Sequence, residues 1–390
     1  MKIYKYILIC LFGIVLFPTS CVMPFDPQGM KATEGILVVE GMIMETGTSI
    51  KLSRTVSIMN TSSDSIPADL RNVYDALVQI IDDDNNIIAI ADPHIINERS
   101  VYVVSDEIKF AYGSKYALDI IVGEKHYKSA FVSPVKTPEI DEIIWKQNPD
   151  GSMDIMVSTH DPNNEIEYYR WEFEEDWEIR SILLGQLRYV FSTNEVIAQS
   201  QFTSNNRYYC WASNKSKSFI LGTSERLTGT TIKNKVIQSF QTNNTRFSYL
   251  YSILIRQYGL DKESYTYFEN LQKNIDQSGS LFSPLFNEIR GNIVCISHPE
   301  ETVIGYITAS NENTKRLFIN MEKIWGEGKD DCEFTRRYGI NELQNMYAAG
   351  YNIMYLANPG SYLCAPVRCL DCTLRGGTKN KPDFWPNDHQ

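Results

Sequence analysis

The sequence predicts a mainly β protein with two β-sandwich regions and a cysteine-rich C-terminal segment. Three observations lead to this fold class. Short runs of β-branched and aromatic residues recur at close spacing, polar turn residues separate them, and one later stretch has the periodicity of a helix. The predicted segments are a signal peptide at residues 1–20, a lipidated tether at 21–35, the sandwiches at 36–135 and 139–328, and the cysteine-rich segment at 329–390.

The first 20 residues are predicted to be a signal peptide. Lys2 and Lys5 precede the apolar run ILICLFGIVLF, which is shorter than the ~20 residues that a membrane-spanning helix needs. The segment resembles the signal peptide of a bacterial lipoprotein, which implies that Cys21 is the lipidated first residue of the mature protein. Pro18 departs from the aliphatic residue usual at that position. The alternative is an ordinary signal peptide with Cys21 as a plain thiol.

The mature chain is acidic. Without the two lysines of the signal peptide it carries 35 Lys and Arg residues against 48 Asp and Glu residues, a net charge of −13. This charge argues against nucleic acid as a partner and against a basic membrane-binding face, so the lipid on Cys21 is the expected membrane contact. The tether lacks the acidic run that commonly marks export to the outer face of the outer membrane. The sequence therefore does not decide between the periplasmic and the external face of the outer membrane.

Residues 36–135 are predicted to form the first β-sandwich from three hairpins. Their strand pairs are ILVVEGMIME with SIKLSRTVSI, DALVQIID with IIAIAD, and the two halves of KYALDIIVGEKHYKSAFV. The last hairpin resembles the transthyretin-like or carboxypeptidase-regulatory type of sandwich. The DDDNN run at residues 82–86 is interpreted as a solvated turn, because Ile87 and Pro93 stand where an EF-hand calcium loop needs glycine and glutamate.

Residues 139–328 are predicted to form the second β-sandwich, after a junction bracketed by Pro134 and Pro138. In the strand YYRWEFEEDWEI, Tyr169, Trp171 and Phe173 alternate with charged residues. This alternation is typical of a half-buried strand, so a sheet core is favoured over an exposed platform for stacking on sugars. The Trp-bearing strand, the NPDG turn and the Tyr-rich strand resemble a fibronectin type III sandwich.

A helix is predicted at about residues 261–277, inserted in the second sandwich. Asp261 is placed to cap its start and Gly279 to end it. An inserted helix of this kind is expected to provide a contact surface. The residues on its predicted inner face are Leu260, Ser264, Tyr267, Phe268, Leu271 and Ile275.

Six cysteines remain beyond the signal peptide and Cys21, and an even number in an oxidising compartment favours disulfides. The C-x2-C spacing at residues 369–372 also fits a zinc site or a redox pair, although no thioredoxin-like frame is predicted around it. We expect the last three cysteines to pair mainly with one another and with Cys332, which would close the tail onto the second sandwich. The candidates are Cys210, Cys295, Cys332, Cys364, Cys369 and Cys372.

The tail APVRCLDCTLRGGTKNKPDFWPNDHQ contains three candidate partner-binding residues, Arg375, Phe384 and Trp385. Trp and Arg are frequent anchors at protein interfaces. Because Trp is mostly buried in folded proteins, the favoured alternative is that Phe384 and Trp385 cover an edge of the protein's own sandwich.

Eight motifs follow one another in a characteristic order: LVVEG, KLSRT, YYRWEFEEDWEIRS, YCW, RFSYLYSILIRQYGLDKESYTYFENL, GNI, VIGYITAS and CLDCTLRGGTKNKPDFW. Together they span nearly the whole mature chain, which resembles the family called domain of unknown function 4249. The resemblance implies an outer-membrane lipoprotein, because family members are predicted to be such proteins. It also implies a TonB-dependent receptor as a partner, because the members are often encoded beside one. It carries no catalytic residue.

The usual signatures of catalysis are missing from the sequence. The five histidines are far apart, and there is no H-E-x-x-H, G-x-S-x-G, P-loop or G-x-G-x-x-G motif. The sequence therefore predicts a non-enzymatic protein with no catalytic residue, no metal and no cofactor. The leading hypothesis is an accessory lipoprotein that captures or presents a ligand for a TonB-dependent receptor. An envelope adhesin or structural binding module, and a hydrolase, are the alternatives.

Overall fold

The computed structural model describes residues 35–56, 71–111, 113–200, 207–227, 229–242, 244–277, 290–320, 332 and 336–386. The predicted signal peptide, Cys21 and the tether up to residue 34 lie outside the described residues. The protein is mainly β, with 52% strand and 12% helix, which confirms the predicted fold class. Within the described ranges, no helix is both long enough and apolar enough to cross a membrane.

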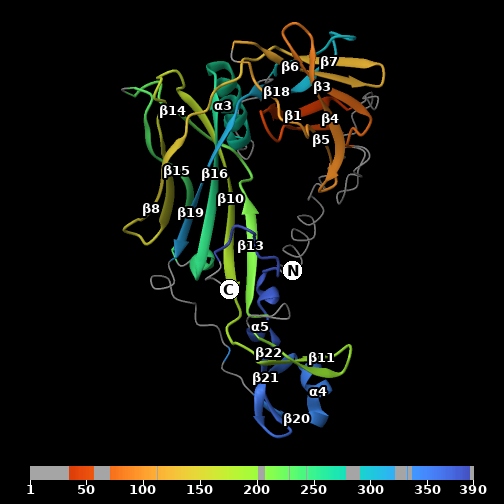
Figure 1. Ribbon diagram of the computed structural model, residues 1–390, viewed down its shortest axis with the longest axis vertical. Coiled ribbons are helices and arrows are strands. Elements are labelled where there is room, and N and C mark those ends of the chain that lie inside the picture. The colour runs from red at the N-terminus through yellow and green to blue at the C-terminus, as the bar shows by residue number, and fades with distance from the viewer. Residues whose placement is uncertain are drawn as a thin grey trace, which may run out of the picture.

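The first body is a nine-stranded sheet that encloses a single apolar core (Figure 1). The three predicted hairpins are present, and Asp82 stabilises the DDDNN turn by accepting hydrogen bonds from the backbone N–H groups of Asp84 and Asn86. The strands are hydrogen-bonded in the order β17-β7-β6-β3-β4-β5-β2-β1-β18. Their bounds are β1 (Leu37–Ile43), β2 (Ser49–Arg54), β3 (Ala76–Asp82), β4 (Ile87–Ile96), β5 (Arg99–Val103), β6 (Tyr116–Val122), β7 (Lys125–Ser129), β17 (Ile293–Cys295) and β18 (Val303–Ala309).

The two ends of this sheet are joined by the side chain of Asn292. Its amide nitrogen donates to the carbonyl of Ile307 in β18, and its amide oxygen accepts from the N–H of the same residue, both at 2.8 Å. Gly305 lets β18 approach β1, since a Cβ at this position would lie 2.1 Å from the carbonyl oxygen of Val39 and the residue has φ +143°.

The second body is a sandwich of two antiparallel sheets. One sheet has the order β13-β10-β16-β19 with β14 beside β10, and the other has the order β15-β9-β8. Tyr169, Trp171 and Phe173 of β10 are buried in the core between the sheets, so the aromatic face predicted for this strand is a core face and not an exposed platform. The bounds are β8 (Ile140–Gln147), β9 (Met153–Thr159), β10 (Tyr168–Arg180), β13 (Tyr209–Lys215), β14 (Ile220–Thr223), β15 (Ile232–Phe240), η2 (Thr245–Phe247), β16 (Leu250–Leu260) and β19 (Glu312–Asn320).

The helix α3 (Lys262–Gln277) follows β16, close to the predicted position. Asp261 caps it, because its Oδ1 accepts a hydrogen bond of 2.7 Å from the backbone N–H of Ser264. Ser264 and Phe268 are buried on the inner face, whereas Ile275 at the far end is exposed. Gly279, the predicted end of the helix, lies outside the described residues.

The boundary between the two bodies differs from the predicted one. Strands β17 and β18, which the sequence assigns to the second sandwich, belong to the first sheet, where Ile293, Val303 and Ile307 join the first core. The chain then runs directly from β18 into β19 of the second body (Figure 1). The first body is therefore completed by a segment that lies in the chain between α3 and β19 of the second body.

The C-terminal residues form a third small body. Strand β22 (Ser361–Pro366) lies between β20 (Arg336–Gly339) and β21 (Tyr351–Asn358). The hairpin of β11 (Leu187–Val190) and β12 (Glu195–Ala198) reaches this body from the second one, and Tyr189 is buried in the shared core. The remaining elements are η3 (Ile340–Glu342), α4 (Leu343–Ala348), α5 (Val367–Leu370) and η4 (Cys372–Arg375).

Two disulfides are present among the described residues, and one of them joins the third body to the second. Cys332 bonds to Cys369, a pair that the expected grouping includes. Cys372 bonds to Cys210 of β13, which corrects the expectation that Cys372 pairs with the other tail cysteines or with Cys332. Cys364 and Cys295 are not bridged and are buried free thiols, which corrects the expectation that all six cysteines are bonded. The reason is position: Cys364 lies in the third core and Cys295 in the first core, and neither core holds a second cysteine among the described residues.

Candidate functional site

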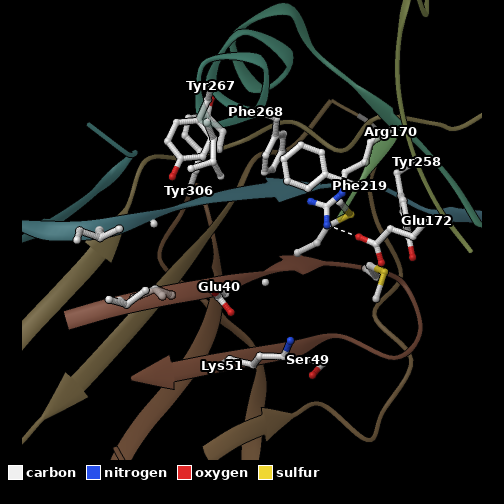
Figure 2. A pocket seen from close by; sticks show the side chains of 18 residues that line it. Glu40, Ser49, Lys51, Arg170, Glu172, Phe219, Tyr258, Tyr267, Phe268 and Tyr306 are labelled. Atoms are coloured by element: carbon white, nitrogen blue, oxygen red, sulfur yellow. Dashed lines mark hydrogen bonds and ion pairs between the residues drawn. The ribbon is translucent and has the colours of Figure 1, made fainter. Parts of the chain in front are cut away.

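A cavity of about 490 Å³ lies between the first and second bodies (Figure 2). Its floor comes from β1 and β2 of the first body, and β18 lies beside β1 with Tyr306 directed toward the roof. Its roof and one side come from α3, β10, β16 and the residue Phe219 before β14.

The roof of the cavity is aromatic. The rings of Tyr267 of α3 and Tyr306 of β18 are stacked, with centroids 4.5 Å apart and planes inclined by 24°. Phe268 follows on the helix, and its ring makes an edge contact with Phe219 at 5.2 Å. Helical spacing places Tyr267, Phe268 and Leu271 on one side of α3, toward the cavity. These rings offer an apolar surface on which a flat or ring-shaped molecule can stack.

An arginine is held between two of these rings. The guanidinium carbon of Arg170 lies 4.8 Å from the ring centroid of Phe219 and 4.9 Å from that of Phe268. The guanidinium also pairs with the carboxylate of Glu172, two residues along β10. Residues two apart on a strand share a face, so the outward face of β10 supplies both charges. The cation–π contacts fix the position of the ion pair at the cavity wall.

The floor carries a second pair of opposite charges. Glu40 of β1 and Lys51 of β2 are directly opposite in the strand register and are both exposed. Figure 2 places them with Ser49 on the two strands below the aromatic roof. The cavity thus has two cations, Lys51 and Arg170, and two anions, Glu40 and Glu172, so its charges balance.

The tyrosines of the cavity are neutral hydroxyls at physiological pH. Burial raises the pKa of Tyr258, Tyr267 and Tyr306. The carboxylate of Glu312 adds to this for Tyr258, whose hydroxyl donates to it at 2.6 Å, and the charge of Glu40 adds to it for Tyr267. Such groups donate and accept hydrogen bonds but do not serve as phenolate bases. The arrangement therefore suits binding of a ligand more than transfer of a proton.

The sequence-predicted site residues lie elsewhere. The cysteine set is divided among the three bodies, and Arg375 and Phe384 are exposed. Trp385 is buried against Trp211 and Leu250, which agrees with the alternative that the tail covers the protein's own sandwich. Phe384 lies beside it under the guanidinium of Arg316, at 3.5 Å from the guanidinium carbon to the ring centroid. The structure brings none of these tail residues to the cavity.

One wall of the cavity was predicted from the sequence. It is the inner face of the helix, which includes Tyr267, Phe268 and Leu271. The other walls were not predictable from the sequence. The alternation in the sequence predicts a solvated face for Arg170 and Glu172, and it places Glu40 and Lys51 only within the first predicted hairpin. No local pattern distinguishes a solvated face from a face that a second body covers.

Comparison with known proteins gives one extensive match. The sequence model of the family described as Domain of unknown function (DUF4249) matches residues 22–316. No curated protein matches the chain. The crystal structure of an alpha-2-macroglobulin mutant from Salmonella is similar over 62% of this chain, with 8% sequence identity and a TM-score of 0.17. The chain spans only 15% of the length of that protein chain.

Proposed function

The chain belongs to the family of domain of unknown function 4249, and from that premise we propose that it is a lipid-anchored, non-enzymatic protein of the outer membrane. In this proposal Cys21 carries the lipid, and the folded bodies capture a ligand for a TonB-dependent receptor with which the protein associates. The cavity between the first and second bodies is the observation that carries the proposal.

The composition of the cavity supports ligand capture. Binding sites for small molecules are typically concave and largely apolar, have a few placed polar groups, and occupy about 300–1,000 Å³. This cavity has the size, the aromatic roof and the four charged side chains. Because its charges balance, it suits an organic molecule with an apolar face, several hydrogen-bonding groups and a net charge near zero.

An exposed apolar surface supports association with a protein partner. On the outer face of the first sheet, Leu77 of β3 and Ile121 of β6 are direct neighbours in the strand register, and Ile90 of β4 lies on the same face. All three are more than a third exposed. Contiguous apolar residues on a protein surface commonly mark a site of interaction.

A mild-detergent pull-down of the tagged protein from its own membranes tests the proposal. We expect a TonB-dependent receptor to co-purify with the wild type and to be recovered less with Cys21→Ala, because the lipid holds both proteins in one membrane. An Ile90→Lys variant should also recover less receptor while the lipid is retained. If lipidated wild-type protein recovers no such receptor, the accessory role is wrong.

A further inference from the structure

The end of β17 and the loop that leads from it to β18 carry three potential metal ligands that lie outside the cavity described above. Cys295, His298 and Glu301 have the spacing C-x2-H-x2-E, and one ligand atom from each lies within 4.8 Å of those of the other two. We propose that these three residues bind a transition-metal dication of the Zn²⁺ type, with the fourth position open to water.

The donor set determines the class of metal. A thiolate, an imidazole nitrogen and a carboxylate oxygen together suit Zn²⁺ and similar borderline ions, whereas Ca²⁺ and Mg²⁺ take oxygen ligands. Three protein ligands are the usual number where zinc keeps one open position. With bond lengths of about 2.0–2.3 Å, the ligand atoms of a tetrahedral site lie roughly 3–4 Å apart. The exposed loop therefore needs to contract by about 1 Å to close around the ion.

Cys295 is a fixed anchor for the site. Its side chain is buried, and β17 places it directly opposite Tyr127 of β7 in the strand register. Its thiol is not in a disulfide. His298 and the chain around it are exposed, so the ion would enter from solvent and meet the thiol at the edge of the first core.

Ser297 connects two of the ligands. Its hydroxyl oxygen accepts a hydrogen bond from the backbone N–H of His126 and lies 3.1 Å from Nδ1 of His298 and 3.4 Å from Sγ of Cys295. A hydroxyl has one hydrogen and two lone pairs. It can therefore accept from Nδ1–H of His298 while it donates to the sulfur of Cys295. This pattern leaves Nε2 with the lone pair that a metal needs and stabilises the thiolate.

Glu301 is oriented by its neighbours in the way that metal-binding carboxylates are. The hydroxyl of Tyr127 donates to Oε1 at 2.8 Å, and the ammonium of Lys125 lies 3.0 Å from Oε2. Each oxygen keeps a second lone pair for an ion. Binding of a dication releases the thiol proton of Cys295, so the two anionic ligands balance the charge of the ion. Lys125 is then a nearby cation that opposes binding.

Titration of the purified, detergent-solubilised protein with Co²⁺ tests the proposal. We expect one Co²⁺ per chain, a thiolate-to-cobalt charge-transfer band in the near ultraviolet, and stoichiometric displacement by Zn²⁺. Cys295→Ser should remove the band. His298→Ala, an exposed change that spares the core, should weaken binding by at least about tenfold. Lys125→Met should tighten it, because the opposing positive charge is removed.

Matched variants distinguish this site from chance binding. Cys364→Ser changes the other described free thiol, His126→Ala changes the histidine on the adjacent strand, and Cys21→Ala removes the predicted lipid site. All three should leave the charge-transfer band and the affinity unchanged. The proposal is overturned if wild-type protein gives no band, if Cys364→Ser removes it, or if His298→Ala binds Co²⁺ as tightly as the wild type.

Discussion

The hydroxyl oxygens of Thr137 and Ser310 lie 2.9 Å apart, although 173 residues separate them in the chain. Thr137 is in the segment that leads from the first body into the second, and Ser310 is in the segment that returns between β18 and β19. Both side chains are buried. Two of the segments that cross between the bodies are thus hydrogen-bonded to each other.

Loss of the Thr137 hydroxyl is predicted to destabilise the junction. The hydroxyl accepts from the N–H of Gly259 at 2.8 Å and donates to the carbonyl of Asn311 at 2.6 Å. Thr137→Val keeps the volume but leaves the buried N–H of Gly259 without its acceptor and removes one of the two hydroxyl donors to the carbonyl of Asn311, which we expect to lower the free energy of unfolding by about 1–3 kcal/mol. Urea denaturation measures this. Thr137→Ser, which keeps the hydroxyl, should lose less than half as much, and equal losses would contradict the role of the hydrogen bonds.

The disulfide between Cys210 and Cys372 is predicted to contribute strongly to stability. It closes a loop of 162 residues and joins β13 to the tail that carries Trp385. The double change Cys210→Ser with Cys372→Ser should lower the free energy of unfolding by about 2–5 kcal/mol. Tryptophan fluorescence should shift to longer wavelength at lower urea concentration, because Trp385 leaves the core when the tail detaches. Cys364→Ala, which removes a thiol and breaks no bridge, serves as the control.

Local features of the fold were predictable from the sequence, whereas long-range ones were not. The alternation of β10, the turn at residues 82–86 and the cap of α3 depend on side chains within a few positions of each other, and the structure contains all three. The return of β17 and β18 to the first sheet depends on pairing across more than 160 residues. Strands of three and seven residues carry no local mark of which sheet they join.

The same distinction applies to the cavity and the disulfides. The residues of α3 that form the roof lie on a face that helical periodicity predicts. Arg170 lines the cavity only because two phenylalanines from other segments close on it. The pairing of Cys210 with Cys372 likewise follows from the docking of the tail on β13, where the backbones of Trp211 and Thr378 exchange hydrogen bonds of 2.9 and 2.8 Å. Spacing of cysteines carries no information on such docking.

The stacked tyrosines are predicted to hold the ligand. If the protein is purified from its own membranes, a bound small molecule should be recovered by denaturing extraction and identified by mass spectrometry. Tyr306→Ala removes one ring of the stacked pair with Tyr267. We expect this change to weaken ligand binding by about 1.4 kcal/mol or more. Recovery should therefore fall about tenfold under conditions where the site is not saturated.

Two further variants check that prediction. Leu271→Trp should reduce recovery by filling the cavity from the helix side. Tyr355→Ala changes an exposed tyrosine of the third body and should have no effect. Recovery of the same molecule in equal amounts from Tyr306→Ala and from the wild type would show that the molecule binds elsewhere.

The stability of the second body is predicted to depend on pH through Asp161. Burial of its carboxyl acts to raise the pKa, but the backbone N–H groups of Glu165, Asn163 and Ile166 donate to the carboxylate, and the net result is a pKa below the ordinary value. A group whose pKa is lower in the folded state stabilises the fold above its unfolded pKa, which is ~3.9 for aspartate. That stabilisation is lost as the pH falls through the lower folded value.

Replacement of Asp161 separates this charge effect from simple loss of a contact. Asp161→Asn removes the negative charge and places an amide donor against the N–H groups, so we expect a loss of about 2 kcal/mol of unfolding free energy at pH 7. In urea denaturation repeated from pH 7 to pH 3, the difference from the wild type should shrink below about pH 4, because the Asp161 carboxyl of the unfolded wild type takes up a proton there while that of the folded protein, with its lower pKa, still resists protonation. Asp84→Asn, in an exposed turn, should change stability by less than about 0.5 kcal/mol throughout. If the difference in unfolding free energy between Asp161→Asn and the wild type stays constant down to pH 3, the carboxylate charge is not what stabilises the second body. The geometry of the loop would then account for the loss.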